Sequence, residues 1–198
     1  IINALRKRQI NHLVYLSSDA VYSDSKELIS EKSETKPNSL HGLMHLTRET
    51  MLSSLKNKFF CVVRPTLIYG NEDPHNGYGP NKFFRLAKKN KDILIFGKGE
   101  ELRDHVWSED VAEVICRVVI NKSVGTINLA TGSVMSFNEI ARKIIQLTKS
   151  SSIIKSVKRI GPMPHNGYRA FNIRCCRKAF GDFSYNSFSD TIKKINMN

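Results

Sequence analysis

Hydroxyl, carboxyl and imidazole groups lie close together in the first quarter of the sequence. A Ser-Ser-Asp sequence at residues 17–19 follows directly after the apolar run 13–16. A short apolar run is typical of a strand buried on both faces of a parallel sheet, and such sheets bind ligands at the carboxyl ends of their strands. His41 and His45 are four residues apart, so on a helix their side chains share one face. A hydroxyl at a strand end and two imidazoles one helical turn apart form a candidate acid/base site.

The elements that must position these groups can be read from capping signals and apolar runs. Ser39 is predicted to cap the helix that carries both histidines, and Asp110 is predicted to begin a later helix. Ser136 and Glu139 form a capping-box pattern at the start of another helix. Further strands are predicted at residues 59–63, 93–96, 125–130 and 171–173, and further helices at 81–90 and 189–196.

Four motifs, in this order along the chain, resemble those of a known family. Residues 17–22 read SSDAVY, and residues 41–45 keep the spacing of a Tyr-x-x-x-Lys pair with histidine at both places. Residues 64–70 resemble the motif R-P-x-x-x-Y-G, and residues 103–112 resemble a segment that starts with R-D and ends with D-x-A. Over nearly its whole length the chain therefore resembles the extended short-chain dehydrogenase/reductase family, the NAD(P)-dependent epimerases and dehydratases of nucleotide sugars.

The resemblance implies an α/β fold, with a partial Rossmann-type parallel sheet from the family's fourth strand onward and a small C-terminal α/β lobe for the substrate. Residues 1–70 and 104–130 would belong to the dinucleotide-binding domain, and residues 71–103 and 131–198 to the substrate lobe. The sequence contains no glycine-rich turn of the kind that binds a pyrophosphate. We therefore expect that the N-terminal βαβ unit is absent and that this chain alone binds NAD weakly. We also expect strand 13–16 to present an unpaired apolar edge, which favours aggregation.

The resemblance also implies roles for individual residues. Ser18 stands where a hydroxyl positions the substrate in the family, and His41 stands where a tyrosine is the acid/base. His45 stands where a lysine holds the nicotinamide ribose. Catalytic roles are thus expected for Ser18, His41 and His45, and contacts with NAD or NADP are expected for Ser17, His45, Arg64, Pro65 and Thr66.

Arg103 stands where an arginine of the family grips the diphosphate of the nucleotide sugar, and a guanidinium group suits two phosphate oxygens. Alternatively, Arg103 and Asp104 belong to an ordinary surface ion pair, which would contribute little. A second arginine of the family is replaced by Met163, and Arg159 or Arg169 would have to compensate. Substrate contacts are expected for Asp19, Ala20, Asn81, Arg103 and Arg169.

Three interpretations of the histidine pair stay open. An imidazole has an ordinary pKa of about 6.5, so His41 could accept a proton near neutral pH without help from a lysine. Two histidines one turn apart could also share a zinc ion, but the glutamate of the H-E-x-x-H motif is missing, so no metal site is predicted. If the catalytic pair has been lost, the protein is a binding or scaffold protein of the same fold.

Composition narrows the remaining classes. Hydrophobic residues make up 40% and charged residues 25% of the chain, as in ordinary globular proteins. No signal peptide or membrane span is recognised, and the four cysteines lack zinc-like spacing, so a reducing, cytoplasmic setting is expected. The net charge is +13, but the lysines are scattered without interleaved aromatic residues, which argues against nucleic-acid binding. The expected partners are a nucleotide sugar and a second copy of the chain, because family members commonly dimerise through the helix that here carries His41.

Overall fold

The computed structural model describes residues 2–8, 10–55, 59–71, 73 and 76–197. Its strands are β1 (Leu13–Leu16), β2 (Phe60–Pro65), β3 (Leu67–Tyr69), β4 (Ile93–Phe96), β5 (Leu102–Trp107), β6 (Gly125–Leu129), β7 (Val134–Ser136), β8 (Ile154–Val157) and β9 (Tyr168–Arg169). Its α-helices are α1 (Ile2–Arg6), α2 (Leu40–Ser53), α3 (Pro80–Lys88), α4 (Ser108–Ile120), α5 (Phe137–Thr148), α6 (Arg174–Ala179) and α7 (Phe188–Met197). Two short 3-10 helices are η1 (Asp19–Val21) and η2 (Pro164–Gly167).

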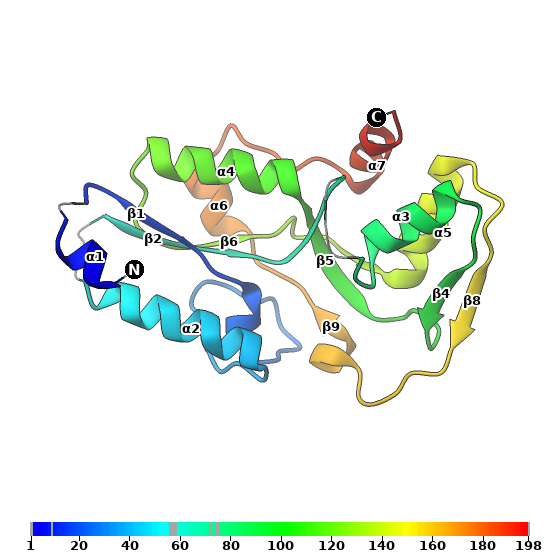
Figure 1. The fold of residues 1–198 in the computed structure, drawn as a ribbon, viewed down its shortest axis with the longest axis horizontal. Coiled ribbons are helices and arrows are strands. Elements are labelled where there is room, and N and C mark those ends of the chain that lie inside the picture. Colours follow the sequence, from blue (N-terminus) through cyan, green and yellow to red (C-terminus); the bar gives the residue numbers. More distant parts are fainter. Residues whose placement is uncertain (1, 9, 56–58, 72, 74–75, 198) are drawn as a thin grey trace.

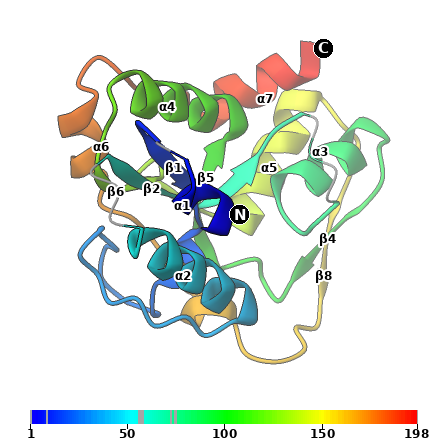
Figure 2. The same cartoon turned by 60° about the vertical axis from the view of Figure 1, so that its left-hand side comes forward.

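The first half of the fold is a parallel sheet in the order β1-β2-β6. Figure 1 shows α2 on one face of this sheet and α4 on the other, and Figure 2 shows the same arrangement after rotation. The face toward α4 carries an apolar cluster to which α6 also contributes, through Cys176 and Phe180 at its end. This architecture confirms the predicted α/β fold with a partial Rossmann-type sheet.

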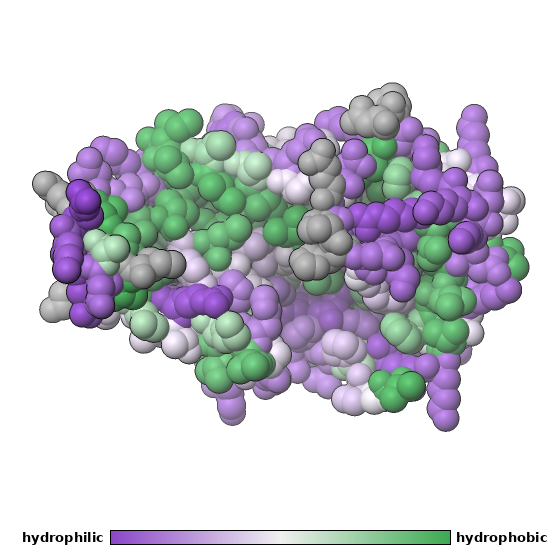
Figure 3. Space-filling model, viewed as in Figure 1, coloured by the Kyte–Doolittle hydropathy of each residue, from purple (hydrophilic) through white to green (hydrophobic). Residues whose placement is uncertain are grey.

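Strand β1 differs from the prediction that it is buried on both faces. Its residues are only partly buried, and Leu16 is 45% exposed. The reason is that β1 pairs with β2 alone among the described strands, so it lies at the edge of the sheet. Figure 3 shows apolar surface over the region of β1 and α4. Val119 and Ile120, at the end of α4, are exposed apolar residues.

Strand β5 is the centre of the second half. It pairs with β3 and β9 in parallel and with β7 in the antiparallel direction. Beyond it, β4 and β8 form a two-stranded parallel sheet, and α3, α5 and α7 pack around an apolar cluster that contains Phe83, Phe137 and Ile140. None of the described helices combines the length and the apolar character that a membrane crossing requires.

Two local predictions are confirmed and two are wrong. Ser39 caps α2 by accepting a hydrogen bond from Gly42, and the capping box between Ser136 and Glu139 is present in full. Asp110 does not begin α4, which starts at Ser108; its carboxylate instead accepts two hydrogen bonds from Asn186. The predicted strand at 171–173 is wrong, since only a single bridge between Ile29 and Phe171 forms there. The strand in this part of the chain is β9, which precedes residue 171 and pairs with β5, and α6 begins soon after.

Candidate functional site

The carboxyl end of β1 meets the beginning of α2. Ser18 caps η1 by accepting a hydrogen bond of 3.1 Å from the backbone N–H of Ala20, which leaves its own hydroxyl proton free to be donated. The carbonyl oxygen of Ala20 would lie only 2.0 Å from a Cβ atom placed on Gly42, so the backbone of α2 lies directly against this turn. The residue before Gly42 is His41. The fold thus brings the Ser18 turn and the histidine helix together.

The two histidines differ in their surroundings. His41 is exposed, and its ring meets the ring of His45 edge-on at a centroid distance of 4.6 Å. The Nδ1 atom of His45 forms a 2.9 Å hydrogen bond with the hydroxyl of Tyr15 on β1. Partial burial, followed by the charges of His41 and Arg48, lowers the pKa of His45, so His45 is neutral at pH 7. Sequence reasoning missed Tyr15, although it precedes Ser17 by two residues and so shares its strand face.

Three of the residues predicted near the cofactor are buried and already hydrogen-bonded. The hydroxyl of Ser17 donates to Glu49 Oε1 at 2.5 Å, and Arg64 donates to both oxygens of Glu49 at 3.0 and 2.6 Å. Thr66 donates to the Asp104 carbonyl at 3.1 Å, and Pro65 is the buried last residue of β2. The Glu49 carboxylate, which sequence reasoning did not single out, is thus the link between α2 and the ends of β1 and β2.

Arg103 is buried and is oriented by one carboxylate. Its Nε donates to Glu101 at 2.7 Å, and Arg159 donates to the other oxygen of Glu101 at 3.2 Å. The two terminal nitrogens of Arg103 bond no residue in the described part of the chain. The side chain of Arg103 is only 9% exposed, so the alternative of an ordinary surface pair with Asp104 is excluded. The arrangement holds a guanidinium by its Nε and leaves its fork for an acceptor such as phosphate.

Arg169, predicted to contact the substrate, is fully engaged within the chain. Its side chain is 2% exposed, and its Nε donates to Asp19 at 2.8 Å. Its other nitrogens donate to the backbone carbonyls of Asp19, Ser23 and Tyr22. Arg169 therefore holds the loop after β1 against β9. Asp19 is the carboxylate partner in this contact, and Ala20 lies between the turn and α2.

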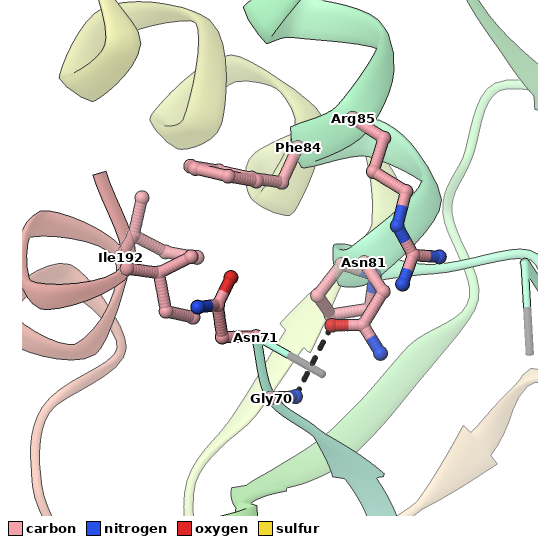
Figure 4. Close-up of a pocket in the computed structure, with 8 residues that line it drawn as sticks. Gly70, Asn71, Asn81, Phe84, Arg85 and Ile192 are labelled. Atoms are coloured by element: carbon pink, nitrogen blue, oxygen red, sulfur yellow. Dashed lines mark hydrogen bonds between the residues drawn. The ribbon is translucent and has the colours of Figure 1, made fainter. Parts of the chain in front are cut away.

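Asn81 lies at the start of α3 beside a cavity of about 80 Å³. Figure 4 shows its side chain facing Gly70, whose N–H donates to Asn81 Oδ1 at 3.1 Å. The Nδ2 atom of Asn81 donates to Asp73 at 2.7 Å. Both ends of the amide are thus used to fasten the loop after β3 to α3.

Asp104, the neighbour of Arg103, is 1% exposed and makes no ion pair with any described residue. It accepts hydrogen bonds from Thr131 N, Thr131 Oγ1 and Gly132 N at 3.0, 2.8 and 2.8 Å. Burial raises the pKa of Asp104 to about 6, and these hydrogen bonds oppose that rise only in part. Its role is to hold the turn after β6 against β5. No group of three or more histidine, cysteine, aspartate or glutamate side chains in the described ranges could hold a metal ion.

Comparison with known proteins places this geometry in context. Residues 1–130 match the sequence model of the family described as NAD dependent epimerase/dehydratase. The chain is 27% identical to the dTDP-D-glucose 4,6-dehydratase of Mus musculus over 178 residues, which is 85% of this chain and 50% of that protein. The chain spans about half the length of the curated relatives it matches first.

Solved structures show the same fold. The UDP-glucuronic acid 4-epimerase of Bacillus cereus, in complex with UDP-glucuronic acid and NAD, superposes with a TM-score of 0.86 at 18% identity. The superposition covers 99% of this chain and 63% of that one. The UDP-glucose 4-epimerase of Thermotoga maritima, with UDP-glucose, gives a TM-score of 0.83 at 16% identity and covers 99% of this chain and 65% of that one. With about two thirds of its residues matched by the family's sequence model, the chain belongs to the NAD dependent epimerase/dehydratase family.

Proposed function

We propose that the protein acts on a nucleotide sugar with NAD or NADP, as an epimerase or dehydratase of its family. The observation that carries this proposal is the state of Arg103, which Glu101 holds through Nε while the rest of the guanidinium stays available. Arg103 stands where the family resemblance implies a diphosphate contact. The names of the related enzymes, which are dehydratases and epimerases of dTDP- and UDP-sugars, support the same substrate class.

In this proposal His41 is the acid/base. Ser18 has a hydroxyl proton to donate and would position the sugar, and exposed His41 would accept the proton of the sugar hydroxyl. The nicotinamide would supply the hydride chemistry. His45 would act through position, since Tyr15 fixes its ring by a hydrogen bond at Nδ1.

The chain's fit to the cofactor rests mainly on His45. Ser17, Arg64 and Thr66 already have partners within the chain, whereas Nε2 of His45 bonds no described residue. This nitrogen suits a hydrogen bond to a ribose hydroxyl. A neutral imidazole cannot replace the positive charge of a lysine, so we propose weak NAD binding by this chain alone.

A non-catalytic binding or scaffold role is the second candidate. It is favoured by the histidines at both positions of the catalytic pair and by the internal bonding of Ser17, Arg64 and Thr66.

We also propose self-association through α2, because this helix exposes large apolar side chains at Leu40, Leu43, Met44 and Met51. Sedimentation of the chain as a monomer at all concentrations would contradict that assembly.

Turnover separates the two candidates. In a preparation that converts a nucleotide sugar with NAD, His41→Phe should reduce kcat by about 100-fold or more, the usual size of a general acid–base contribution. Thr47→Ala, an exposed change on the same helix, should leave kcat unchanged. Unchanged turnover in His41→Phe would rule out the assigned acid/base.

Substrate binding is tested by titrating residues 1–198 with UDP-glucose in a calorimeter. Arg103→Met should weaken binding by about tenfold or more, because a charge-assisted hydrogen bond to phosphate is lost. Arg142→Met is the matched control, since Arg142 is exposed and its only hydrogen bond among the described residues is to Asn138. Equal affinities in all three proteins would exclude Arg103 from the site.

A further inference from the structure

A histidine outside the predicted site is oriented by a carboxylate. His165 lies in η2, on the segment that joins β8 to β9. Its Nδ1 is 2.5 Å from Oδ1 of Asp24, and the other oxygen of Asp24 accepts a hydrogen bond from Asn38. The side chain of His165 is 28% exposed. This contact joins the loop after β1, the residue before the cap of α2 and the segment before β9.

The backbone around His165 is unusual. His165, Asn166 and Gly167 have φ values of 50°, 53° and 80°, three successive residues in the left-handed region. Residues other than glycine rarely adopt this conformation, and strained backbone of this kind is concentrated at functional sites. Here the left-handed turn is what directs the imidazole toward Asp24.

The hydrogen bond to Asp24 fixes which ring nitrogen carries the proton. Nδ1 of His165 has two polar neighbours, Oδ1 of Asp24 at 2.5 Å and a terminal nitrogen of Arg169 at 3.2 Å. A carboxylate can only accept and a guanidinium can only donate, so one ring form cannot hydrogen-bond to both through Nδ1. We assign the proton to Nδ1 because the contact with Asp24 is the shorter one and, against the opposing effect of burial, the hydrogen bond and charge of His165 help to keep the pKa of Asp24 below its ordinary value. In the neutral ring Nε2 is then an acceptor, and it bonds no described residue. The diphosphate of a nucleotide sugar is esterified at both ends and fully ionised near neutral pH, so its oxygens also only accept. It can bond to Nε2 only if the ring takes up a proton there.

The charges of two guanidinium groups act on the same imidazole. Arg169 places a terminal nitrogen 3.2 Å from Nδ1, and Arg103 acts from β5, where it is paired in register with Arg169. Burial, then the charge of Arg169 and that of Arg103, lower the pKa of His165, and Asp24 opposes them only in part. The ring is therefore neutral near pH 7 as long as no anion is bound nearby.

The charges around this place are balanced before any ligand arrives. The carboxylates are those of Asp19, Asp24 and Glu101, and the guanidinium groups are those of Arg103, Arg159 and Arg169. A diphosphate at the fork of Arg103 would bring further negative charge, which favours the protonated form of a neighbouring imidazole. Protonated His165 would then supply a positive charge for the diphosphate, in addition to the three guanidinium charges that the carboxylates already balance.

We propose that His165 is a further ligand of the substrate diphosphate, beside Arg103 and Arg159, and that it takes up one proton at Nε2 as the diphosphate binds. The inference rests on the proposed function, which places the diphosphate at Arg103. Asp24 is the positioning residue, since it fixes the ring's tautomer and direction. As the pH rises from the pKa of His165 in the free protein to its higher pKa in the complex, the affinity for a diphosphate should fall by up to about tenfold per pH unit.

Calorimetry with UDP-glucose as the probe tests this on residues 1–198, because its diphosphate is esterified at both ends and has no proton to lose near neutral pH. Titrations at one pH in two buffers of different ionisation enthalpy should show uptake of close to one proton per UDP-glucose bound. His165→Gln should abolish this uptake and lower the affinity at pH 6 about tenfold, with little effect at pH 8.5. His12→Gln, whose histidine bonds the Ser123 carbonyl instead, should retain both uptake and affinity.

A second variant and a spectrum guard against misfolding. Asp24→Asn should move the decline in affinity to lower pH, because it removes the charge that stabilises the protonated ring. The imidazole resonances of His165, followed by NMR, should titrate at higher pH with inorganic pyrophosphate than without it. Binding of UDP-glucose that needs Arg103 but shows equal proton uptake with and without His165 would overturn the inference alone. Absence of UDP-glucose binding would overturn the proposed function and the inference together.

Discussion

The guanidinium of Arg169 and the carboxylate of Asp19 are 150 residues apart in sequence, yet they form a 2.8 Å hydrogen bond in the interior. The bond closes the loop after β1 onto β9, so the turn that presents Ser18 is held from the far end of the chain. Arg169→Met should therefore leave Asp19 without its charge partner and reduce the free energy of unfolding by about 3–5 kcal/mol. Urea denaturation measures this, and exposed Arg174→Met should change stability by less than about 0.5 kcal/mol.

Gly42→Ala should destabilise the protein although alanine normally favours a helix by about 1 kcal/mol over glycine. The added Cβ would lie 2.0 Å from the Ala20 carbonyl oxygen and 2.8 Å from Pro37 Cβ, and the carbonyl is backbone that cannot rotate away. The start of α2 must then move off the Ser18 turn. Thermal unfolding should show a lower Tm for Gly42→Ala and a nearly unchanged Tm for Thr47→Ala. A stabilised Gly42→Ala protein would show that α2 does not press on this turn.

The Glu49–Arg64 pair should behave as a buried ion pair, because each side chain is only 8% exposed. Glu49→Leu alone leaves the Arg64 charge buried without its partner, and we expect a loss of about 3–5 kcal/mol. The double variant Glu49→Leu, Arg64→Met should recover much of that loss, since no buried charge remains. A double-mutant cycle from urea curves measures the coupling. Additive effects of the two substitutions would contradict it.

Asp104 should make stability depend on pH in the acidic range. Burial raises its folded-state pKa from 3.8 to about 6, so the folded state holds the proton more tightly than the unfolded state does. Its contribution is therefore most favourable below pH 4 and is lost as the pH rises to 6, by about 3 kcal/mol in total at about 1.4 kcal/mol per pKa unit.

The measurement is the difference between the stability curves of the protein and of Asp104→Asn from pH 4 to pH 6. The substitution removes the ionisable group, so the difference should change across this window. Glu27→Gln, which removes an exposed carboxyl group, should give a parallel curve. A constant difference for Asp104→Asn would mean that the pKa of Asp104 is not raised.

The sequence predicts correctly those helix starts that depend only on neighbouring residues. The Ser39 cap and the box of Ser136 and Glu139 depend on side chains bonding backbone three residues away, so their spacing is enough to predict them. The similar signal at Asp110 predicts the wrong start for α4. Its carboxylate bonds Asn186, 76 residues later, and no local pattern reports such a partner.

The candidate site shows the same division. The sequence singled out Ser18, His41, His45 and Arg103 by residue type and motif. It did not indicate Tyr15 as the partner of His45 or Glu101 as the partner of Arg103, because a single sequence does not report which side chains meet when the chain folds.

The sequence alone was thus enough to identify the candidate residues, the family motifs and the alternation of strands and helices. The tertiary structure decided which charges are paired and which remain available. Arg103 and Arg169 look equivalent as letters, and β5 and β9 place them in register side by side. Only packing makes them different: the loop after β1 encloses the guanidinium of Arg169 with acceptors, whereas Glu101 holds Arg103 by one nitrogen and leaves its fork unbonded within the described chain.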